Sequence, residues 1–442
     1  MLHKDLTNQY YVDWLAFLEK SKAWSRQEID DYQFLQLKNK AEYVWEHTPG
    51  YRKLWQTFGV HPNSLKSLED VNAFPRISKA QLCEDIDAFT VKKEGMAYTS
   101  TGGSTGIALG FYRTAEAFAR ELASKAHQYH RVGWREGDRQ VVLRGVPITH
   151  ASNMQFFPEF NELRFSSYHL TLDEMEKYRK KSHEYQPEWL RCYPSSGYRF
   201  AKYIQESGKP FPPLKGILVS SENLYDFQKK CMEDAFSCRI FNHYGQFEQV
   251  ALAGYCEKAD TFHVLPHYGH VQLLDANGNT VTTKGMLGEI VATSFLMDAT
   301  CFFRYNTGDF AVYGGESCPA CGRPYQIWER VEGRLQDFIV TKSNRYISLT
   351  AMNMHDDIFF NIKQFQYYQD SPGVVILKYI PKDMQAAYID EEDIKKRLYL
   401  KLGEDVELHL RKVDEGEMQR TPRGKFMYIQ QKLKLGAYDI CK

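Results

Sequence analysis

The sequence predicts an α/β protein with a large N-terminal domain built on mixed sheets and a small α+β C-terminal domain. Its 442 residues exceed the length of a typical single domain and suffice for a large core and a second, smaller unit. Short apolar runs alternate with helical segments over the first part of the chain, which is typical of an α/β sheet. From Val264 onward the pattern changes to strands joined by turns, which indicates antiparallel pairing.

Three helices are predicted before the first buried strand. Residues 27–46 carry apolar side chains at helical spacing, and a turn is expected after them at His47–Gly50, which contains Pro and Gly. Ser78 is a suitable N-cap residue, so a second helix is expected to begin after it. The third helix is predicted from Thr114 to His130.

The strands of the N-terminal domain follow in chain order. Short apolar runs predict buried strands at Val141–Leu143, Gly216–Ser220 and Arg239–Phe241. Two antiparallel strands are predicted at Val271–Asp275 and Gly288–Thr293, with a turn at Ala276–Asn279 after the first of them.

A domain boundary is predicted near Gln336. It divides the chain into an N-terminal domain of residues 1–335 and a C-terminal domain of residues 336–442. The second part combines a strand at Gly373–Tyr379 with a charged helix at Glu391–Leu402, and it is long enough for a small domain.

The composition excludes several classes of protein. Lys and Arg together number 56, as do Asp and Glu, so the formal net charge is zero and no global basic field would recruit nucleic acid. We expect no membrane span, because no apolar stretch of about 18 residues is present, and the first residues lack the apolar core of a signal peptide. Nine scattered cysteines fit a reducing compartment, so we expect a cytoplasmic protein.

The most informative segment is the Gly/Ser/Thr-rich run Thr99–Gly106. Glycines let backbone N–H groups crowd around a polyphosphate, and hydroxyls add further donors. The run lacks the Gly-Lys-Ser/Thr ending of a Walker loop, and alone such a run is typical of a surface loop. Further motifs follow in order at Tyr244–Glu248, Arg304–Asp309 and Gly333–Asp337, with Lys425 near the C-terminus. In this order the motifs resemble those of enzymes that activate a carboxylate with ATP.

The motifs carry a family resemblance. The run TSTGGSTG, continued by Leu109–Tyr112, resembles the phosphate loop of adenylate-forming acyl ligases, above all the phenylacetate–CoA ligase branch and the CapK-like capsular polysaccharide biosynthesis proteins. Tyr193–Ser196 and Val219–Glu222 resemble two further signposts of that branch. The resemblance covers nearly the whole chain. It implies a large adenylate-forming domain, a small mobile C-terminal domain and a reaction through an acyl-AMP intermediate.

The resemblance also assigns residues to the nucleotide and to catalysis. Tyr244 would pack on adenine, Asp309 would accept hydrogen bonds from the ribose hydroxyls, and Glu248 would hold Mg²⁺, which prefers oxygen ligands. Arg334 would contact the ribose or phosphates, and Lys425 would stabilise charge as a carboxylate attacks the α-phosphate. The residues implied for cofactor binding are Ser100, Thr101, Gly102, Gly103, Ser104, Thr105, Gly106, Ser221, Glu222, Tyr244, Gly245 and Asp309; those implied for catalysis are Lys425, Glu248 and Arg334.

Four positions depart from the family pattern. Phe247 replaces a Thr or Ser whose hydroxyl would contact the acyl-phosphate. Asn306 stands where the phenylacetate branch usually has Arg, and Gln336 stands where the hinge residue is usually Asp or Lys. Asn344 takes the place of a Gly in the first C-terminal turn, and because Asn tolerates the left-handed conformation we expect this turn to be retained.

Four residues outside these motifs form a candidate metal site. Cys318 and Cys321 make a Cys-x-x-Cys knuckle, whose spacing lets two thiolates occupy adjacent tetrahedral corners. Cys256 and His263 lie on the preceding stretch and could complete a Cys₃His set, and relatives in this branch have a similar pattern. We expect structural Zn²⁺ here; a redox pair or unliganded thiols are the alternatives.

The acyl pocket is expected between Tyr193–Ser196, Ser220–Glu222 and Phe241–Tyr244, whose aromatic content favours an aromatic or medium-sized acid. The expected ligands are therefore ATP, Mg²⁺ and a small carboxylic acid. The acyl acceptor is coenzyme A in the phenylacetate branch, and an amine on a sugar or amino acid is the alternative suggested by CapK-like relatives. Two other functions stay open: an adenylyltransferase that stops at AMP transfer to a small molecule, and a non-catalytic nucleotide-binding protein on the ligase fold.

Overall fold

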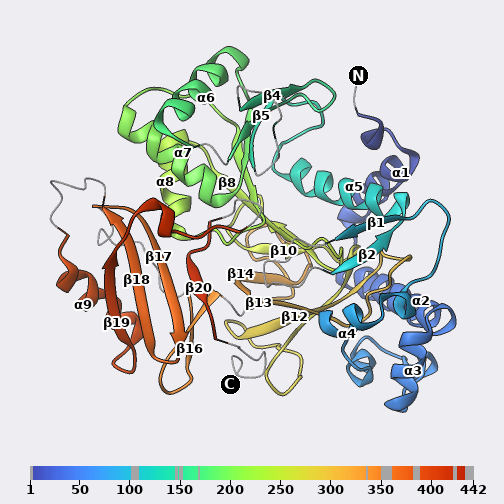
Figure 1. Ribbon diagram of the computed structural model, residues 1–442. Helices are drawn as coiled ribbons and strands as arrows, with labels where there is room; N and C mark the ends of the chain where they lie inside the picture. The colour runs from blue at the N-terminus through green and yellow to red at the C-terminus, as the bar shows by residue number, and fades with distance from the viewer. Residues whose placement is uncertain are drawn as a thin grey trace.

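The computed structural model of the chain contains one large sheet flanked by helices and a smaller sheet to one side of it (Figure 1). It describes residues 3–100, 109–144, 148, 153–167, 170–334, 337–349, 361–381, 389–421 and 426–433. The helices are α1 (Gln9–Lys20), α2 (Arg26–His47), α3 (Pro49–Thr57), α4 (Lys79–Glu84), α5 (Ala115–Arg131), α6 (Leu172–Tyr185), α7 (Pro194–Ser207), α8 (Asp226–Phe236) and α9 (Glu391–Leu402).

The helices predicted from the sequence are present. Those expected at 27–46, from Thr114 and at 391–402 are α2, α5 and α9, so these predictions are confirmed. The predicted cap of α4 is also confirmed, because the Ser78 side chain accepts a hydrogen bond from the backbone N–H of Gln81.

The end of α2 differs in part from the prediction. The helix stops at His47 as expected, but the turn predicted at His47–Gly50 is limited to Thr48. Pro49 is the first residue of α3, because its fixed φ suits a helix start and its missing N–H would have no helical partner there.

Twelve strands form the large sheet, in the order β11-β12-β13-β14-β10-β9-β8-β7-β6-β3-β5-β4. Their bounds are β3 (Gln140–Arg144), β4 (Met154–Phe157), β5 (Glu162–Ser166), β6 (Trp189–Cys192), β7 (Gly216–Ser220), β8 (Ile240–Gly245), β9 (Leu252–Tyr255), β10 (Phe262–Val264), β11 (Gly269–Leu274), β12 (Leu287–Ser294), β13 (Tyr305–Gly315) and β14 (Ile327–Arg334). Strands β5, β3, β6, β7 and β8 run parallel, and the neighbours beyond them pair antiparallel. The mixed α/β sheet is therefore confirmed.

Helices cover both faces of the parallel part. Successive strand residues point to opposite faces, so Leu190 and Ile217 pack in one core with α6, α7 and α8, whereas Trp189 and Leu218 pack in another with α1 and α5. Figure 1 shows α6, α7 and α8 grouped together, apart from α1 and α5. Because the helices cover the faces, the carboxyl ends of the parallel strands are the natural place for a ligand.

The predicted strands match the structure closely, with one extension. Val141–Leu143 lies in β3 and Gly216–Ser220 is β7. The strand expected at Arg239–Phe241 is β8, which begins one residue later and continues to Gly245. Tyr244 and Gly245 therefore end a sheet strand rather than form a separate turn.

The remaining strands form three small sheets. Strands β1 (Ala97–Ser100) and β2 (Gly110–Arg113) form one hairpin, and β15 (Phe338–Val340) and β16 (Tyr346–Ser348) form another. The third sheet has the order β19-β18-β17-β20 and consists of β17 (Ile362–Ser371), β18 (Val374–Pro381), β19 (Glu407–Lys412) and β20 (Ile429–Gln431).

The C-terminal sheet packs against α9 through an apolar core to which Tyr225, just before α8, also contributes. Ile394 and Leu398 of α9 lie in one cluster with Leu377 of β18. The turn between β15 and β16 contains Asn344 with φ 59°, so the predicted left-handed residue is confirmed. The boundary predicted near Gln336 falls on residues 335–336, outside the described part of the chain.

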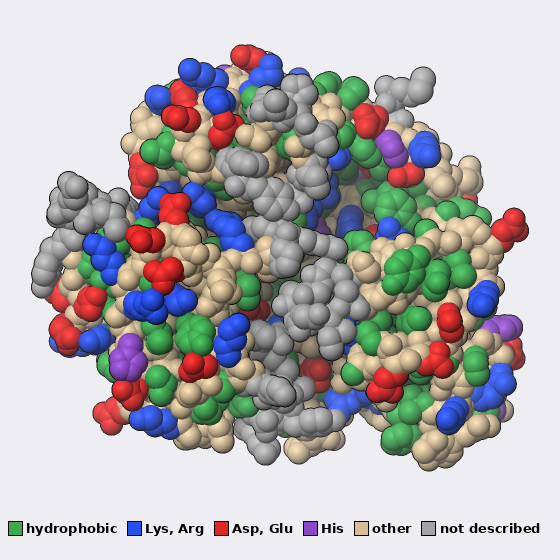
Figure 2. Space-filling view, in the orientation of Figure 1, with side chains coloured by type: hydrophobic (Ala, Val, Ile, Leu, Met, Phe, Trp, Pro, Cys, Tyr) green, Lys and Arg blue, Asp and Glu red, His purple; other side chains and the backbone are tan. Residues whose placement is uncertain are grey.

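The face of the molecule seen in this orientation has no dominant charge. In Figure 2, acidic and basic side chains are interspersed outside the grey residues, as the formal net charge of zero leads one to expect. Among the described helices, none combines the length and the apolar character that are needed to cross a bilayer.

Candidate functional site

A cavity of about 620 Å³ lies where β8, β13 and β14 meet the C-terminal part of the chain. This volume is in the range of small-molecule sites. Six of the residues predicted to bind the nucleotide or act in catalysis line it: Ser221, Glu222, Tyr244, Gly245, Asp309 and Arg334. The lining also includes Thr421 and Tyr428, which come from the last part of the chain.

Asp309 is the centre of a hydrogen-bonded group on the cavity wall. Its Oδ2 accepts a hydrogen bond from the Tyr244 hydroxyl at 2.8 Å, and its Oδ1 accepts one from Arg334 Nε at 3.1 Å. The two strands set this geometry, because Asp309 of β13 and Arg334 of β14 are direct cross-strand partners. The structure therefore brings together three residues that are 65 and 25 positions apart in the sequence.

Asp337 adds a second carboxylate beside Arg334. Its Oδ2 accepts a hydrogen bond from the backbone N–H of Arg334 at 2.9 Å. Burial raises the pKa of Asp337 to about 6, although the positive charge of Arg334 acts in the opposite direction. The pKa of Arg334 is raised, mainly by the negative charge of Asp309, so this guanidinium stays charged.

Glu248 is buried just behind this group. Its Oε1 accepts a hydrogen bond from the Tyr305 hydroxyl at 3.1 Å, and burial raises its pKa. It is 9% exposed and does not line the described cavity. The neighbouring Phe247 is 43% exposed, and its ring lies 5.3 Å from the Arg113 guanidinium and 6.4 Å from the ring of Phe111. The residue that departs from the family pattern thus faces β2 instead of offering a hydroxyl.

The segments predicted to form the acyl pocket lie together. The Glu222 carboxylate accepts hydrogen bonds from the backbone N–H of Ser195 at 2.9 Å and from its hydroxyl at 3.1 Å. Ser220 of β7 is the register partner of His243 in β8. Ser221 follows with φ 72°, a left-handed conformation that is uncommon for a residue with a side chain.

Part of the predicted site lies outside the described residues. Ser100 ends β1 and pairs with Gly110 of β2, so the two ends of the segment that carries the Gly/Ser/Thr run are held side by side. Thr101, Gly102, Gly103, Ser104, Thr105, Gly106 and the catalytic candidate Lys425 are not among the residues that the structure describes.

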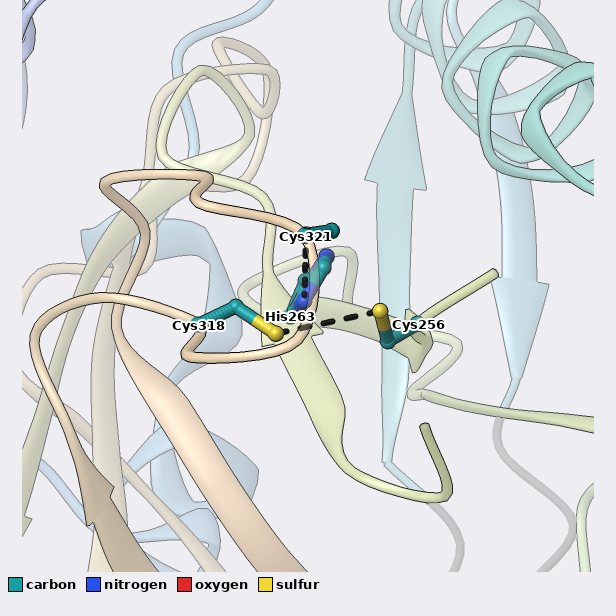
Figure 3. A group of neighbouring side chains, drawn as sticks. All are labelled: Cys256, His263, Cys318 and Cys321. Carbon is teal, nitrogen blue, oxygen red and sulfur yellow. Dashed lines mark hydrogen bonds between the residues drawn. The ribbon is translucent and has the colours of Figure 1, made fainter. Parts of the chain in front are cut away.

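The four candidate metal ligands converge (Figure 3). Cys256 follows β9, His263 belongs to β10, and Cys318 and Cys321 come from the loop between β13 and β14. One donor atom from each lies within 4.8 Å of every other. Cys318 Sγ is 3.7 Å from Cys256 Sγ, and Cys321 Sγ is 3.7 Å from His263 Nε2. Tetrahedral Zn²⁺ with Zn–S bonds of about 2.3 Å separates its sulfur ligands by about 3.8 Å, so the donor set and its spacing fit this ion.

Charged residues surround the cysteine cluster. His263 Nδ1 lies 2.5 Å from Arg131, whose guanidinium also donates to Glu257 at 3.0 Å. Arg323 donates to the other oxygen of Glu257 at 2.7 Å. Burial, with the charges of Arg131 and Arg323, lowers the pKa of His263 to about 3, so its imidazole is neutral.

Three residues near the cavity were missed from the sequence. Tyr225 and Tyr428 line it with ring centroids 5.1 Å apart, but some 200 residues separate them and no local pattern joins them. Arg144 reaches Ser221 with a 2.9 Å hydrogen bond. Arg144 directly follows the apolar run Val141–Leu143, at the carboxyl end of a buried strand. This position could have indicated a site residue from the sequence, because ligands bind at the carboxyl ends of parallel strands.

Comparison with known proteins identifies homologues. Protein CapK of Staphylococcus aureus is 25% identical over 443 residues, which cover 97% of this chain and 93% of CapK. A phenylacetate-coenzyme A ligase of Thermus thermophilus is 24% identical and covers 72% of this chain and 73% of its own length. None of the known protein-family models matches the chain. The family resemblance predicted from the motifs is therefore confirmed.

The fold is that of solved coenzyme A ligases. A 2-hydroxyisobutyryl-CoA ligase in its postadenylation state, in complex with R3-HIB-AMP, superposes with a TM-score of 0.75 at 18% identity and covers 93% of this chain and 91% of its own. The same ligase in an open conformation with 2-HIB-AMP and CoA gives a TM-score of 0.59 at 91% coverage of both chains.

Proposed function

We propose that this protein is an ATP-dependent acid ligase that forms an acyl-AMP and then transfers the acyl group to coenzyme A. The observation that carries the proposal is the hydrogen-bonded group of Tyr244, Asp309 and Arg334 on the wall of the cavity. Support comes from the fold, which a coenzyme A ligase also has in complex with an acyl-AMP, and from the phenylacetate-coenzyme A ligases among the homologues.

The proposed reaction has two steps, and in each of them one bond forms as another breaks. An oxygen of the acid's carboxylate attacks the α-phosphorus of ATP, and pyrophosphate leaves. The thiol of coenzyme A then attacks the acyl carbon, loses its proton, and AMP leaves. The acyl-AMP has to stay bound between the two steps, because water would hydrolyse it outside the closed site.

Asp309 and Arg334 are proposed to hold the ribose and phosphates. A carboxylate has about four acceptor positions, and Tyr244 and Arg334 use two of those on Asp309. The remaining positions can accept the ribose hydroxyls. Arg334 keeps its charge through Asp309, which suits it to bind phosphate oxygens as they gain charge.

Glu248 is proposed to hold Mg²⁺. Its carboxylate supplies the oxygen donors that this ion prefers, and Tyr305 fixes its orientation with a hydrogen bond at 3.1 Å. Bound Mg²⁺ would neutralise part of the phosphate charge. Because burial raises the pKa of Glu248, a cation beside it would also favour the ionised form.

Residues 336–442 are proposed to act as a mobile domain that closes over the cavity and delivers Lys425. Two observations support this proposal. Thr421 and Tyr428 line the same cavity as Asp309, and apart from Tyr225 the buried residues in the apolar core of the C-terminal sheet come from residues after 336. A lysine carried on such a domain supplies charge only when the domain is closed.

Cys256, His263, Cys318 and Cys321 are proposed to hold structural Zn²⁺. The support is the Cys₃His donor set and its spacing, and the fact that all four ligand positions are supplied by the protein. The described cysteines are free of disulfide bonds, which fits the proposed location in the reducing cytoplasm.

The test is pyrophosphate release from ATP·Mg²⁺ across a panel of aromatic, fatty, amino and sugar acids. Each acid is assayed alone, with coenzyme A and with hydroxylamine as a trap for acyl-AMP. We expect release with one class of acid, formation of its hydroxamate, and faster turnover when coenzyme A is present.

Other outcomes identify the alternatives. Release that is accelerated by amino sugars or amino acids instead of coenzyme A would make an amine the acceptor. An AMP adduct that accumulates without acyl transfer would identify an adenylyltransferase. ATP binding without pyrophosphate release from any acid would contradict the proposal and favour a non-catalytic nucleotide-binding protein.

A further inference from the structure

Arg144 occupies an exceptional position at the edge of the parallel sheet. It is the last residue of β3, which β6 separates from β7 and β8, the strands that carry Ser220 and His243. Its guanidinium donates to Ser221 Oγ at 2.9 Å and lies 4.9 Å from the centre of the Tyr193 ring. Ser221 and His243 line the cavity, so Arg144 stands directly behind its wall, in the region expected to receive the acid.

Among the residues that the structure describes, no carboxylate balances the charge of Arg144. In the described ranges, no Asp or Glu oxygen lies within the 4 Å of an ion pair with Arg144. The nearby Glu222 turns both of its oxygens to Ser195. The sequence contains no acidic residue between Arg144 and Glu159, so the following segment supplies none either. Burial lowers the pKa of Arg144, which means that its surroundings disfavour an unpaired charge.

Further positive charge lies beside Arg144. Arg191 NH1 is 3.7 Å from Glu162 Oε1, but the same carboxylate pairs with Arg164 at 2.6 Å, so two guanidiniums share one anion. Arg191 Nε is buried and has no hydrogen-bond partner. The edge of β3 and β6 therefore has more positive than negative charge.

His243 contributes polarity without charge. Its Nδ1 is hydrogen-bonded to the Tyr129 hydroxyl at 2.7 Å. Burial and the nearby charges of Lys125, Arg144 and Arg191 hold the pKa of His243 well below its usual range, so the imidazole is neutral. This part of the cavity wall thus carries hydrogen-bonding groups with a cation behind them, which is a poor environment for a purely apolar acyl chain.

We propose that the acid activated by this protein carries a second carboxylate, which Arg144 binds while the first carboxylate faces the nucleotide. The inference rests on the proposed ligase function and specifies its substrate class. A guanidinium binds a carboxylate through two parallel hydrogen bonds, and such a ligand would balance a charge that the protein leaves unpaired. A dicarboxylic acid thus replaces the aromatic or medium-sized acid favoured by the aromatic content of the sequence.

The test compares matched acids in the pyrophosphate assay with the full-length protein. Succinate is paired with butyrate and glutarate with valerate, so that each pair differs in one terminal carboxylate. We expect kcat/KM to be about 10- to 100-fold higher for the dicarboxylate, the value of one charge-assisted contact. Arg144→Met should abolish this preference and leave the monocarboxylate rate unchanged or higher. Arg144→Lys should retain part of it. Arg164→Met, which removes an arginine paired with Glu162 on β5, should keep it in full.

A second readout separates this inference from the proposed function. The rise in melting temperature caused by each acid alone requires no reaction with ATP. If no acid releases pyrophosphate, the proposed function fails, and dicarboxylate-specific protection that Arg144→Met abolishes would still support the binding site. Equal activity with both members of each pair, or a preference that survives Arg144→Met, would overturn the inference and leave the ligase proposal intact. A preference for 3-phosphonopropionate over succinate would also overturn it, because the bound anion would then be a phosphonate.

Discussion

The cavity and the cysteine cluster are built on neighbouring strands of one sheet, but they use ionisable side chains in opposite ways. At the cavity, Asp309, Arg334 and Asp337 are charged groups that face a space of about 620 Å³. At the cluster, Cys318 and His263 belong to a set of four donors whose ligand atoms all lie within 4.8 Å of one another. One arrangement is open to a ligand, and the other is closed by the protein itself.

This difference predicts which property each region controls. Burial raises the pKa of both Glu248 and Asp337, so keeping these carboxylates ionised lowers the stability of the folded state. Groups that are retained against stability are typical of functional sites. A closed four-ligand site is typical of structural metal. Substitutions at the cavity should therefore act on catalysis, and substitutions at the cluster should act on stability.

The largest effect is expected from Lys425→Ala. If this lysine stabilises charge only during adenylation, the rate of acyl-AMP formation should fall about 1,000-fold. The use of a chemically prepared acyl-AMP with coenzyme A should remain close to the wild-type rate. Single-turnover measurement of each half-reaction checks this, and equal loss in both would contradict the role given to Lys425.

Asp309→Asn should have the next largest effect. The change keeps the shape of the side chain but removes the charge that holds Arg334 and would receive the ribose. We expect kcat/KM for ATP to fall about 100-fold. Asp298→Asn is the matched control, because that carboxylate pairs with Lys93 and does not line the cavity. A similar loss in both variants would mean that Asp309 has no special part in nucleotide binding.

Local features of the fold could be predicted from the sequence. The cap at Ser78 and the left-handed turn at Asn344 depend on a few neighbouring residues, and both are present. The apolar run Gly216–Ser220 predicted a buried strand with the bounds that the structure has. The extension of β8 to Gly245 was missed, because antiparallel pairing with Leu252 of β9, not local sequence, keeps that residue in the sheet.

The site was predictable only where a motif signalled it. Tyr244, Asp309 and Arg334 belong to ordered motifs, so they could be grouped before their contacts were known. Arg144 belongs to no motif, and its unbalanced charge emerges only when the surrounding strands are in place. Likewise, the order of residues could not indicate that Glu248 lies behind the cavity wall and not on it.

Cys318→Ser tests the other region, the cysteine cluster, where the effect should be on stability. If the cluster holds structural Zn²⁺, the wild-type protein should contain about one zinc per chain and the variant much less. Loss of the metal should reduce the free energy of unfolding by about 4 kcal/mol, a size typical of losing a metal site. Elemental analysis and urea unfolding measure the two quantities. The rate of pyrophosphate release per folded molecule should change little, and a selective loss of activity at unchanged stability would reverse the comparison.

The smallest expected effect, and the most specific, is a gain of stability in Asp337→Asn. The pKa of this carboxyl is about 6 in the folded protein and 3.8 ordinarily, so the folded state binds more protons between these values. Its contribution to stability therefore falls as the pH rises from about 4 to about 6, and the loss is complete above that range.

The substitution should remove this loss and leave an acceptor for the backbone N–H of Arg334. Two pKa units correspond to about 3 kcal/mol, and because Asp337 is partly exposed to the cavity we expect a gain of about 1 to 2 kcal/mol above pH 6. Below about pH 4 the variant and wild-type proteins should be equally stable. Urea unfolding across this pH range measures the difference, with Asp234→Asn, on the exposed face of α8, as the control. If the gain in stability of Asp337→Asn did not depend on pH, ionisation of Asp337 would not be its cause. That result would contradict the claim that the cavity keeps its charges at the expense of stability.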